Sequence, residues 1–67
     1  MDLRKLVGKN VREHRRARRL SQEELGFEAG LDRTYISGIE RGTRNPTILI
    51  VGKIARALRV SPDALLR

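Results

Sequence analysis

Apolar residues near the start of the chain recur at helical spacing. The pattern consists of Leu3, Leu6, Val7 and Val11. Steps of three and four residues bring these side chains onto one face of a helix, and the other faces of the segment are mainly basic. The pattern therefore predicts an amphipathic helix over about residues 2–18.

Capping residues mark a short helix over about residues 22–29. Ser21 and Glu24 form a capping box, because each side chain can hydrogen bond to the backbone amide of the other residue. Gly30 follows at the place where a left-handed residue commonly ends a helix. The helix is therefore bounded at both ends by local signals.

A second short helix is expected over about residues 33–41. Asp32 can cap its start, and Gly42 stands where the helix should stop. Two short helices joined by a tight glycine turn are the layout of a helix-turn-helix, whose second helix enters the DNA major groove.

Two further helices are expected after this pair. Asn45-Pro46 predicts a helix start with proline at the first position, giving a helix over about residues 46–58. Ser61-Pro62-Asp63 repeats the signal and predicts a last short helix over about residues 62–66. No segment alternates with a period of two, so no strand is expected. We predict an all-α fold, a compact five-helix bundle forming one domain over residues 1–67.

Charge points to a polyanion as partner. The chain of 67 residues carries 15 Lys and Arg against 8 Asp and Glu, a net charge of +7. Such an excess on a small chain favours nucleic acid binding, and a merely solvated basic helix face is the alternative. The excess is concentrated in Arg12, Arg15, Arg16, Arg18 and Arg19.

Other classes of function find little support in the composition. The chain has no Cys and one histidine, His14, while Ser37 and Ser61 lack a neighbouring base. We therefore expect no enzyme activity, no metal, no cofactor and no small-molecule ligand. No apolar run approaches the roughly 20 residues that span a membrane, and no secretory signal is recognisable, so a cytoplasmic location is expected.

Residues 20–46 carry a family resemblance. The chain resembles the phage-repressor and Cro type of helix-turn-helix, the XRE family, which implies a lambda-repressor-like DNA-binding domain. The stretch LDRTYISGIERGTRN is most similar to the controller proteins of restriction–modification systems, which are small transcriptional regulators. The matching segments are Leu20–Leu25, Ala29–Leu31, Ile36–Ser37, Ile39–Gly42, Asn45–Thr47 and Ala55–Ser61.

The resemblance implies a set of DNA contacts. Arg33 could read guanine. Tyr35 could contact DNA, and the alternative for this residue is partial burial beside the preceding helix. Arg15 and Glu40 align with an ion pair that joins the first and third helices in relatives. The expected base contacts are Arg33, Thr34, Tyr35, Ser37 and Arg44. The expected phosphate contacts are Gln22, Thr43, Asn45 and Arg15.

Two glycines depart from the family pattern. Many relatives have a longer polar residue in place of Gly38, so glycine removes one DNA contact and costs about 1 kcal/mol of helix stability relative to alanine. It either lets the backbone approach DNA or leaves room for Arg33 and Tyr35. We therefore expect specificity to depend more on DNA shape. Gly26 replaces the usual alanine and keeps the small size that close helix packing requires.

The helix over residues 46–58 is more apolar than a core-facing stripe requires. One face can bury Ile48, Val51, Ala55 and Leu58. The surplus apolar residues suggest a homodimer interface, since exposed apolar clusters commonly mark contacts, although they could instead fill the core of this small protein. The expected interface residues are Leu49, Ile50, Ile54, Val60 and Leu65.

The combined prediction is a sequence-specific transcriptional regulator. It would act as a homodimer on a near-palindromic operator in double-stranded DNA, with half-sites about 34 Å apart. RNA polymerase is a further candidate partner. Two alternatives remain open: an antitoxin whose main partner is a toxin protein, and a module that binds nucleic acid without sequence preference or bridges other proteins.

Overall fold

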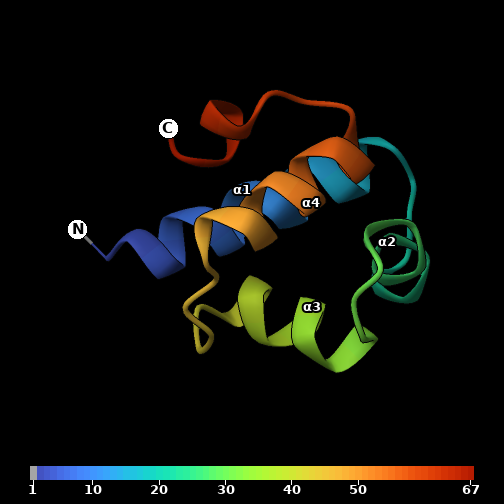
Figure 1. The fold of residues 1–67 in the computed structure, drawn as a ribbon, viewed down its shortest axis with the longest axis horizontal. Helices are drawn as coiled ribbons and strands as arrows, with labels where there is room; N and C mark the ends of the chain where they lie inside the picture. The colour runs from blue at the N-terminus through green and yellow to red at the C-terminus, as the bar shows by residue number, and fades with distance from the viewer. Residues whose placement is uncertain (1) are drawn as a thin grey trace.

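Four α-helices and one short 3-10 helix make up the fold. The computed structural model describes residues 2–67, and within them no strand is present. Figure 1 shows α4 lying across α1, with α3 below this pair and α2 closing one end. The helices are α1 (Leu3–Ala17), α2 (Gln22–Ala29), α3 (Arg33–Arg41), α4 (Ile48–Leu58) and the 3-10 helix η1 (Pro62–Leu65).

The predicted all-α architecture is confirmed, with two corrections near the C-terminal half. The fifth element is a 3-10 turn and not an α-helix. The helix expected to begin at Pro46 begins at Ile48, because Thr47 caps it and accepts a hydrogen bond from the Ile50 amide at 3.2 Å. Ser61 makes no capping hydrogen bond to the backbone; its hydroxyl donates to the Asp63 carboxylate instead.

The predicted caps of α2 and α3 are present. In the capping box, the Ser21 amide donates to Glu24 Oε1 at 2.8 Å, and the Glu24 amide donates to Ser21 Oγ at 2.9 Å. Asp32 caps α3 and accepts from the Thr34 amide. Gly30 and Gly42 end the two helices with φ angles of 72° and 77°. These left-handed conformations cost glycine nothing, so both helices stop at a defined residue.

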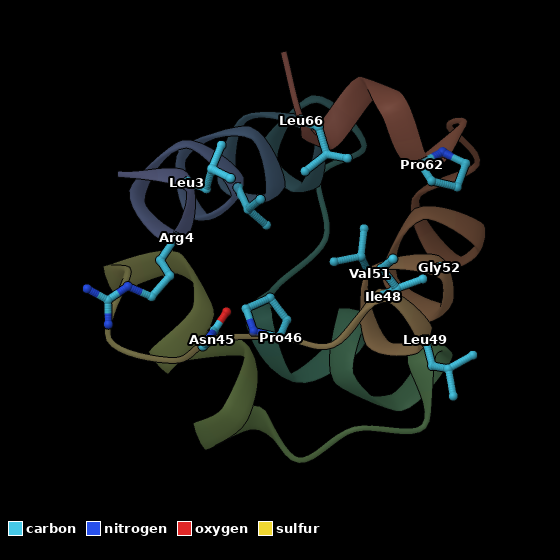
Figure 2. Close-up of a pocket in the computed structure, with 11 residues that line it drawn as sticks. Leu3, Arg4, Asn45, Pro46, Ile48, Leu49, Val51, Gly52, Pro62 and Leu66 are labelled. Carbon is cyan, nitrogen blue, oxygen red and sulfur yellow. The ribbon is translucent and has the colours of Figure 1, made fainter. Parts of the chain in front are cut away.

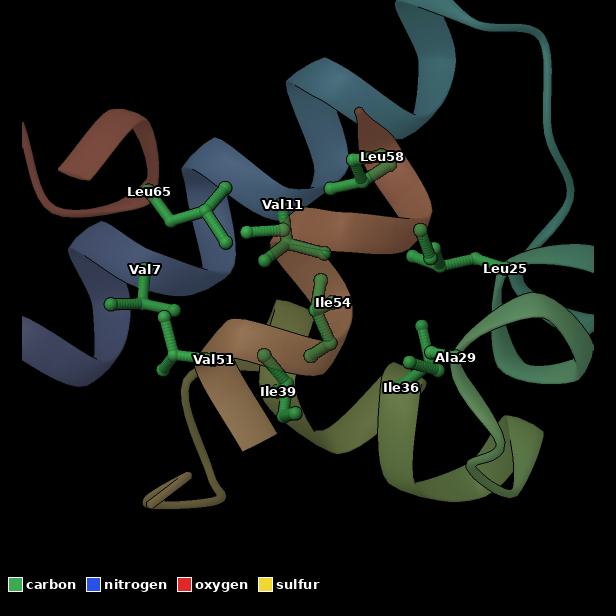
Figure 3. Packing of buried hydrophobic residues seen from close by; sticks show 12 residues of the cluster. Val7, Val11, Leu25, Ala29, Ile36, Ile39, Val51, Ile54, Leu58 and Leu65 are labelled. Atoms are coloured by element: carbon green, nitrogen blue, oxygen red, sulfur yellow. The ribbon is translucent and has the colours of Figure 1, made fainter. Parts of the chain in front are cut away.

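The core draws on every element of the fold (Figure 3). Its side chains are spaced three or four residues apart within each helix, so each helix turns one apolar stripe inward. The fully or nearly fully buried members are Val7, Val11, Leu25, Ala29, Ile36, Ile39, Val51, Ile54, Ala55, Ala57, Leu58 and Leu65.

The inward face of α4 differs from the predicted one. Ile54 and Leu65 are completely buried inside the monomer, so they belong to the core and not to the expected dimer interface. Ile48, expected in the core, is 87% exposed. The buried stripe runs through Val51, Ile54, Ala55 and Leu58, and Ile48 lies at its margin in the first turn of the helix. For Ile54 and Leu65, the alternative that surplus apolar groups fill the core is therefore correct.

Glycines allow two pairs of backbone segments to approach closely. A Cβ atom added to Gly8 would lie 2.2 Å from the backbone oxygen of Ile39, where α1 crosses α3. A Cβ atom added to Gly26 would lie 2.5 Å from the backbone oxygen of Leu31. Both distances are well below normal contact, so the small size expected at Gly26 is used to bring α2 against the turn that follows it.

A buried amide fastens the C-terminal segment to α1. Nδ2 of Asn10 donates to the carbonyl oxygens of Leu65 at 3.0 Å and Arg67 at 3.2 Å. Asn10 lies on the inner side of α1, where it is almost fully buried. These bonds satisfy backbone carbonyls and hold η1 over the end of the core.

Candidate nucleic-acid interface

A polar hollow lies between the start of α2 and the outer face of α3. Its volume is about 280 Å³. The sequence placed four of its lining residues in the DNA-binding site, and the fold brings these four together. The fifth, Arg41, was not among the predicted site residues. The polar hollow is lined by Gln22, Arg33, Thr34, Ser37 and Arg41.

Hydrogen bonds hold several side chains of the polar hollow in place. Asp32 Oδ1 accepts from both the amide and the hydroxyl of Thr34, at 2.7 and 2.6 Å. The hydrogen bond from the Thr34 hydroxyl is the main reason that the pKa of Asp32 lies below its ordinary value. Arg41 donates to the hydroxyl of Ser37, four residues earlier on the same helix face. The i, i+4 spacing is the sequence signal that could have placed Arg41 in the site.

The loop after α3 forms a second polar region. Cζ of Arg44 lies 5.1 Å from the centre of the Tyr35 ring. At this distance the positively charged guanidinium group is attracted to the face of the ring by a cation–π interaction. Tyr35 is half-buried and packs on the core, so the expected partial burial is confirmed, and its contact with DNA stays a prediction. Thr43 donates through its hydroxyl to the Gly38 carbonyl oxygen at 3.1 Å. The space above Gly38 is thus filled by Arg44 and not by Arg33.

An ion pair between α1 and α3 lies directly behind the polar hollow. Arg15 Nε donates to Glu40 Oε2 at 2.6 Å, and Arg15 Nη2 donates to Oε1 at 3.0 Å. The carboxylate also accepts from Gln22 Nε2 at 3.1 Å and contacts Arg12 at 3.5 Å. The predicted ion pair is present, and it ties the last turns of α1 and α3 to the start of α2.

The ion pair changes what two of the predicted phosphate contacts do. Nη1 of Arg15 donates to the Leu20 carbonyl oxygen at 2.8 Å, so every guanidinium nitrogen of this buried residue is used inside the fold. Arg15 is therefore a structural residue, and the prediction that it contacts a DNA phosphate is wrong. The Gln22 side chain also points to Glu40, which leaves the backbone amides at the start of α2 as the groups available to an anion.

Opposing effects set the pKa of Glu40. Burial alone would raise it, since a charged carboxylate is costly to desolvate. Hydrogen bonds from Arg15 and Gln22, with the positive charge of Arg15, outweigh burial and hold the pKa of Glu40 below its usual range. The same hydrogen bond raises the pKa of Arg15. The pair is therefore ionised in the folded protein at neutral pH.

An apolar groove lies on another part of the surface (Figure 2). It has a volume of about 560 Å³ and is formed by the start of α1, the start of α4 and the C-terminal segment. Leu49 is 77% exposed there. Asn45, an expected phosphate contact, lines the groove beside Arg4 and does not line the polar hollow. The apolar groove is lined mainly by Leu3, Val7, Pro46, Ile48, Leu49, Val51, Pro62 and Leu66.

Two other kinds of site were not found among residues 2–67. They contain no group of three or more His, Cys, Asp or Glu side chains placed to hold a metal ion. None of the helices that they form is both long enough and apolar enough to cross a membrane.

Comparison with known proteins agrees with this geometry. A family model described as helix-turn-helix matches residues 11–65, most of the chain. The chain belongs to the helix-turn-helix family. Control protein C.BamHI of Bacillus amyloliquefaciens is 50% identical over 66 residues, which are 97% of this chain and 82% of that protein. Control protein C.SmaI of Serratia marcescens is 42% identical over 98% of this chain and 79% of its own length.

A solved structure shows the same likeness in three dimensions. The restriction–modification controller protein C.AhdI from Aeromonas hydrophila superposes with a TM-score of 0.90 at 45% identity. The match covers 92% of this chain and 90% of that one. Helix-turn-helix relatives of this kind are transcriptional regulators, and these findings support a DNA-binding regulator function for the present chain.

The family assigns roles to two helices. In a helix-turn-helix, the second helix of the motif enters the major groove and its N-terminal residues face base edges. That helix is α3, and the polar hollow runs along it from Arg33 to Arg41. The first helix of the motif, α2, points its free N-terminal amides toward the same side. The polar hollow therefore lies beside the N-terminal residues of α3, which are the residues that face base edges in this motif.

Proposed function

We propose that this protein is a sequence-specific regulator that reads double-stranded DNA through the polar hollow. The observation that carries the proposal is the gathering of Arg33, Thr34, Ser37 and Arg41 along the outer face of α3, beside the start of α2. These side chains supply donors on a helix whose family places it in the major groove. The net charge of +7 adds attraction to the phosphate backbone.

Each side chain of the interface has a proposed task. Arg33, at the first residue of α3, binds guanine O6 and N7, while Thr34 and Ser37 contact nearby base edges or a thymine methyl group. The backbone amides at Gln22 and the exposed side chain of Thr43 bind phosphates, which fix the register on the duplex without reading sequence. Asn45 is proposed as a phosphate contact at the border of the apolar groove.

We further propose that the protein acts as a homodimer joined through the apolar groove. One copy carries a single α3, so it cannot occupy two successive major grooves about 34 Å apart. Two copies related by a two-fold axis can. The groove offers the apolar surface that such a contact buries, and its exposed apolar side chains are Leu3, Ile48, Leu49 and Leu66.

The proposed interface keeps part of the set expected from sequence. Leu49 lies on the groove and is exposed. Ile50 and Val60 are half-buried against the core, so they can contribute only their outer edges. Ile48 joins the interface in place of the buried Ile54.

A role in a restriction–modification system is the finer proposal. It is supported by the printed names of the relatives, C.BamHI, C.SmaI and C.AhdI. Such a regulator would bind DNA beside the genes that it controls, and activation there would involve RNA polymerase. The absence of binding to promoter DNA of any neighbouring restriction gene would contradict this role and leave the DNA-binding proposal intact.

Selection from a randomised duplex pool tests the DNA-binding proposal. The purified protein is incubated with the pool at near-physiological salt, and the bound duplexes are sequenced. We expect a near-palindrome bound roughly a thousandfold more tightly than random DNA. An unenriched pool, with binding that falls steeply with salt, would show contact with phosphates alone and would overturn the proposal.

A further inference from the structure

Gly38 lies beneath the side chain of Arg44. A Cβ atom added to Gly38 would lie 2.6 Å from Cγ and 3.3 Å from Nε of Arg44. Side chains do not approach one another so closely, so any other residue at this position would push Arg44 away. The three nearest atoms all belong to this flexible side chain and none to backbone. Cγ moves by rotation about the Cα–Cβ bond, so a larger residue would turn the whole Arg44 side chain away from Gly38.

Two hydrogen bonds bring the loop to Gly38. The Thr43 amide donates to the Gly38 carbonyl oxygen at 3.0 Å, and the Thr43 hydroxyl donates to the same oxygen at 3.1 Å. Arg44 is the next residue, so its side chain begins beside the last turn of α3. The direction that this side chain takes is then decided by the free space above Gly38.

Tyr35 provides the surface on which the guanidinium rests. It precedes Gly38 by three residues and so lies on the same face of α3. The distance of 5.1 Å between Cζ of Arg44 and the ring centre is that of a cation–π contact. Because Tyr35 packs on the core, its ring is a fixed support for an otherwise mobile arginine.

We propose that Gly38 is a specificity-determining position that acts through Arg44. By lacking a side chain, it lets Arg44 fold over α3 onto Tyr35, which holds the exposed guanidinium at the surface of α3 as a preorganised DNA contact. Tyr35 and Arg44 then read DNA as one unit. This inference rests on the proposed DNA-binding function and adds a positioning role for a residue with no side chain of its own.

The proposal predicts opposite effects of Gly38→Ala on stability and on binding. Alanine is the better helix former, and only a flexible side chain must move, so the melting temperature of the free protein should stay the same or rise. DNA affinity should fall about tenfold, the loss of one good base or phosphate contact. The base preference recovered by selection should change at the positions that Arg44 reads.

A double-mutant cycle separates action through Arg44 from a direct clash with DNA. Affinities for the selected duplex are measured for the wild type, Gly38→Ala, Arg44→Ala and the double variant, with Arg56→Ala as a control that removes one exposed charge elsewhere. We expect each single variant to lose about tenfold, and the double variant to lose no more than either. Additive losses, or an unchanged affinity in Gly38→Ala, would overturn the proposal.

A second measurement tests the geometry without DNA. In the free wild-type protein, the δ protons of Arg44 should show NMR shifts caused by the aromatic ring, and these shifts should vanish in Gly38→Ala. Unperturbed Arg44 protons in the wild type would contradict the inference. If selection recovered no motif with the wild type, the DNA-binding proposal would fail, and this measurement would still decide whether Gly38 places Arg44.

Discussion

The polar hollow and the apolar groove differ in how their side chains are held. In the hollow, Thr34 is hydrogen-bonded to Asp32, Arg41 contacts Ser37, and Gln22 donates to a buried carboxylate. In the groove, Ile48 and Leu49 project into solvent with no polar partner and little cover. A polar face with fixed donors is suited to a hydrogen-bonding ligand. An apolar face with exposed side chains gains most from contact with a second protein surface.

The two regions also differ in their place along the chain. All residues of the hollow lie between residues 22 and 41, within one motif and its caps. The groove combines the start of α1, the start of α4 and the C-terminal segment. The lining of the hollow therefore comes from α2 and α3 alone, whereas the lining of the groove comes from segments far apart in the sequence.

The largest expected effect concerns the ion pair behind the hollow. Glu40→Ala leaves the buried Arg15 charge without its partner and should destabilise the fold by about 3–5 kcal/mol. Urea unfolding followed by circular dichroism measures this loss. Lys9–Glu13 is an exposed pair on α1, and Glu13→Ala is the matched control, expected to cost well under 1 kcal/mol. Equal losses in the two variants would contradict the structural role given to Glu40.

A charge in the groove should separate the two copies. Leu49→Glu places a carboxylate in the proposed interface and should weaken dimerisation by about 2 kcal/mol or more, roughly 30-fold. Sedimentation equilibrium measures the change. Phe27→Glu is the matched control, because Phe27 is 88% exposed on α2 and does not line the groove. A wild type that stays monomeric, or a control that dissociates equally, would rule out this interface.

A charge removed from the hollow should alter DNA recognition and leave the dimer intact. Arg33→Ala should weaken specific binding by about 1–3 kcal/mol and relax the preference at one base pair. Fluorescence anisotropy with the selected duplex and single-base variants measures both effects. Arg56→Ala controls for the lost charge. If the two variants weakened all duplexes alike, Arg33 would be a phosphate contact and not a base contact.

Low pH should reduce the stability of the fold through protonation of Glu40. Its pKa in the folded protein lies below the unfolded value, so its contribution to stability is complete above about pH 4.3 and is lost as the pH falls through the folded pKa. Each unit of difference is worth about 1.4 kcal/mol. In Glu40→Gln, urea unfolding should lose part of its pH dependence below pH 4.3. An unchanged pH profile would assign the acid sensitivity to other carboxylates.

The polar hollow was largely predictable because its signals are local. The Ser21–Glu24 capping box, Asp32, Gly30 and Gly42 fix the ends of α2 and α3, and helix periodicity then places the side chains of α3. The Arg15–Glu40 pair came from family resemblance, since its partners are 25 residues apart. Its consequence, that Arg15 is enclosed and unavailable to phosphate, required the packing of α1 against α3.

The groove could not be derived in the same way. Ile48 and Ile54 are the same residue type on one helix, so composition cannot say which is buried. Which isoleucine is buried depends on where α4 begins and on which segments pack against it. The Thr47 cap places the start of α4 two residues later than the sequence predicted. The bonds from Asn10 to the C-terminal carbonyls join residues more than 50 positions apart and leave no local signal. The contact of Arg44 with Tyr35 likewise depends on the path of a loop.

The proposals together require that the polar hollow contacts DNA and that the apolar side chains of the groove do not. Amide chemical shifts of isotope-labelled protein, recorded during titration with the selected duplex, test this requirement most directly. We expect the largest changes at the start of α2, along Arg33–Arg41 and in the loop through Arg44, with small changes around Leu49 and Leu66. Changes centred on the groove, with α3 unaffected, would contradict it.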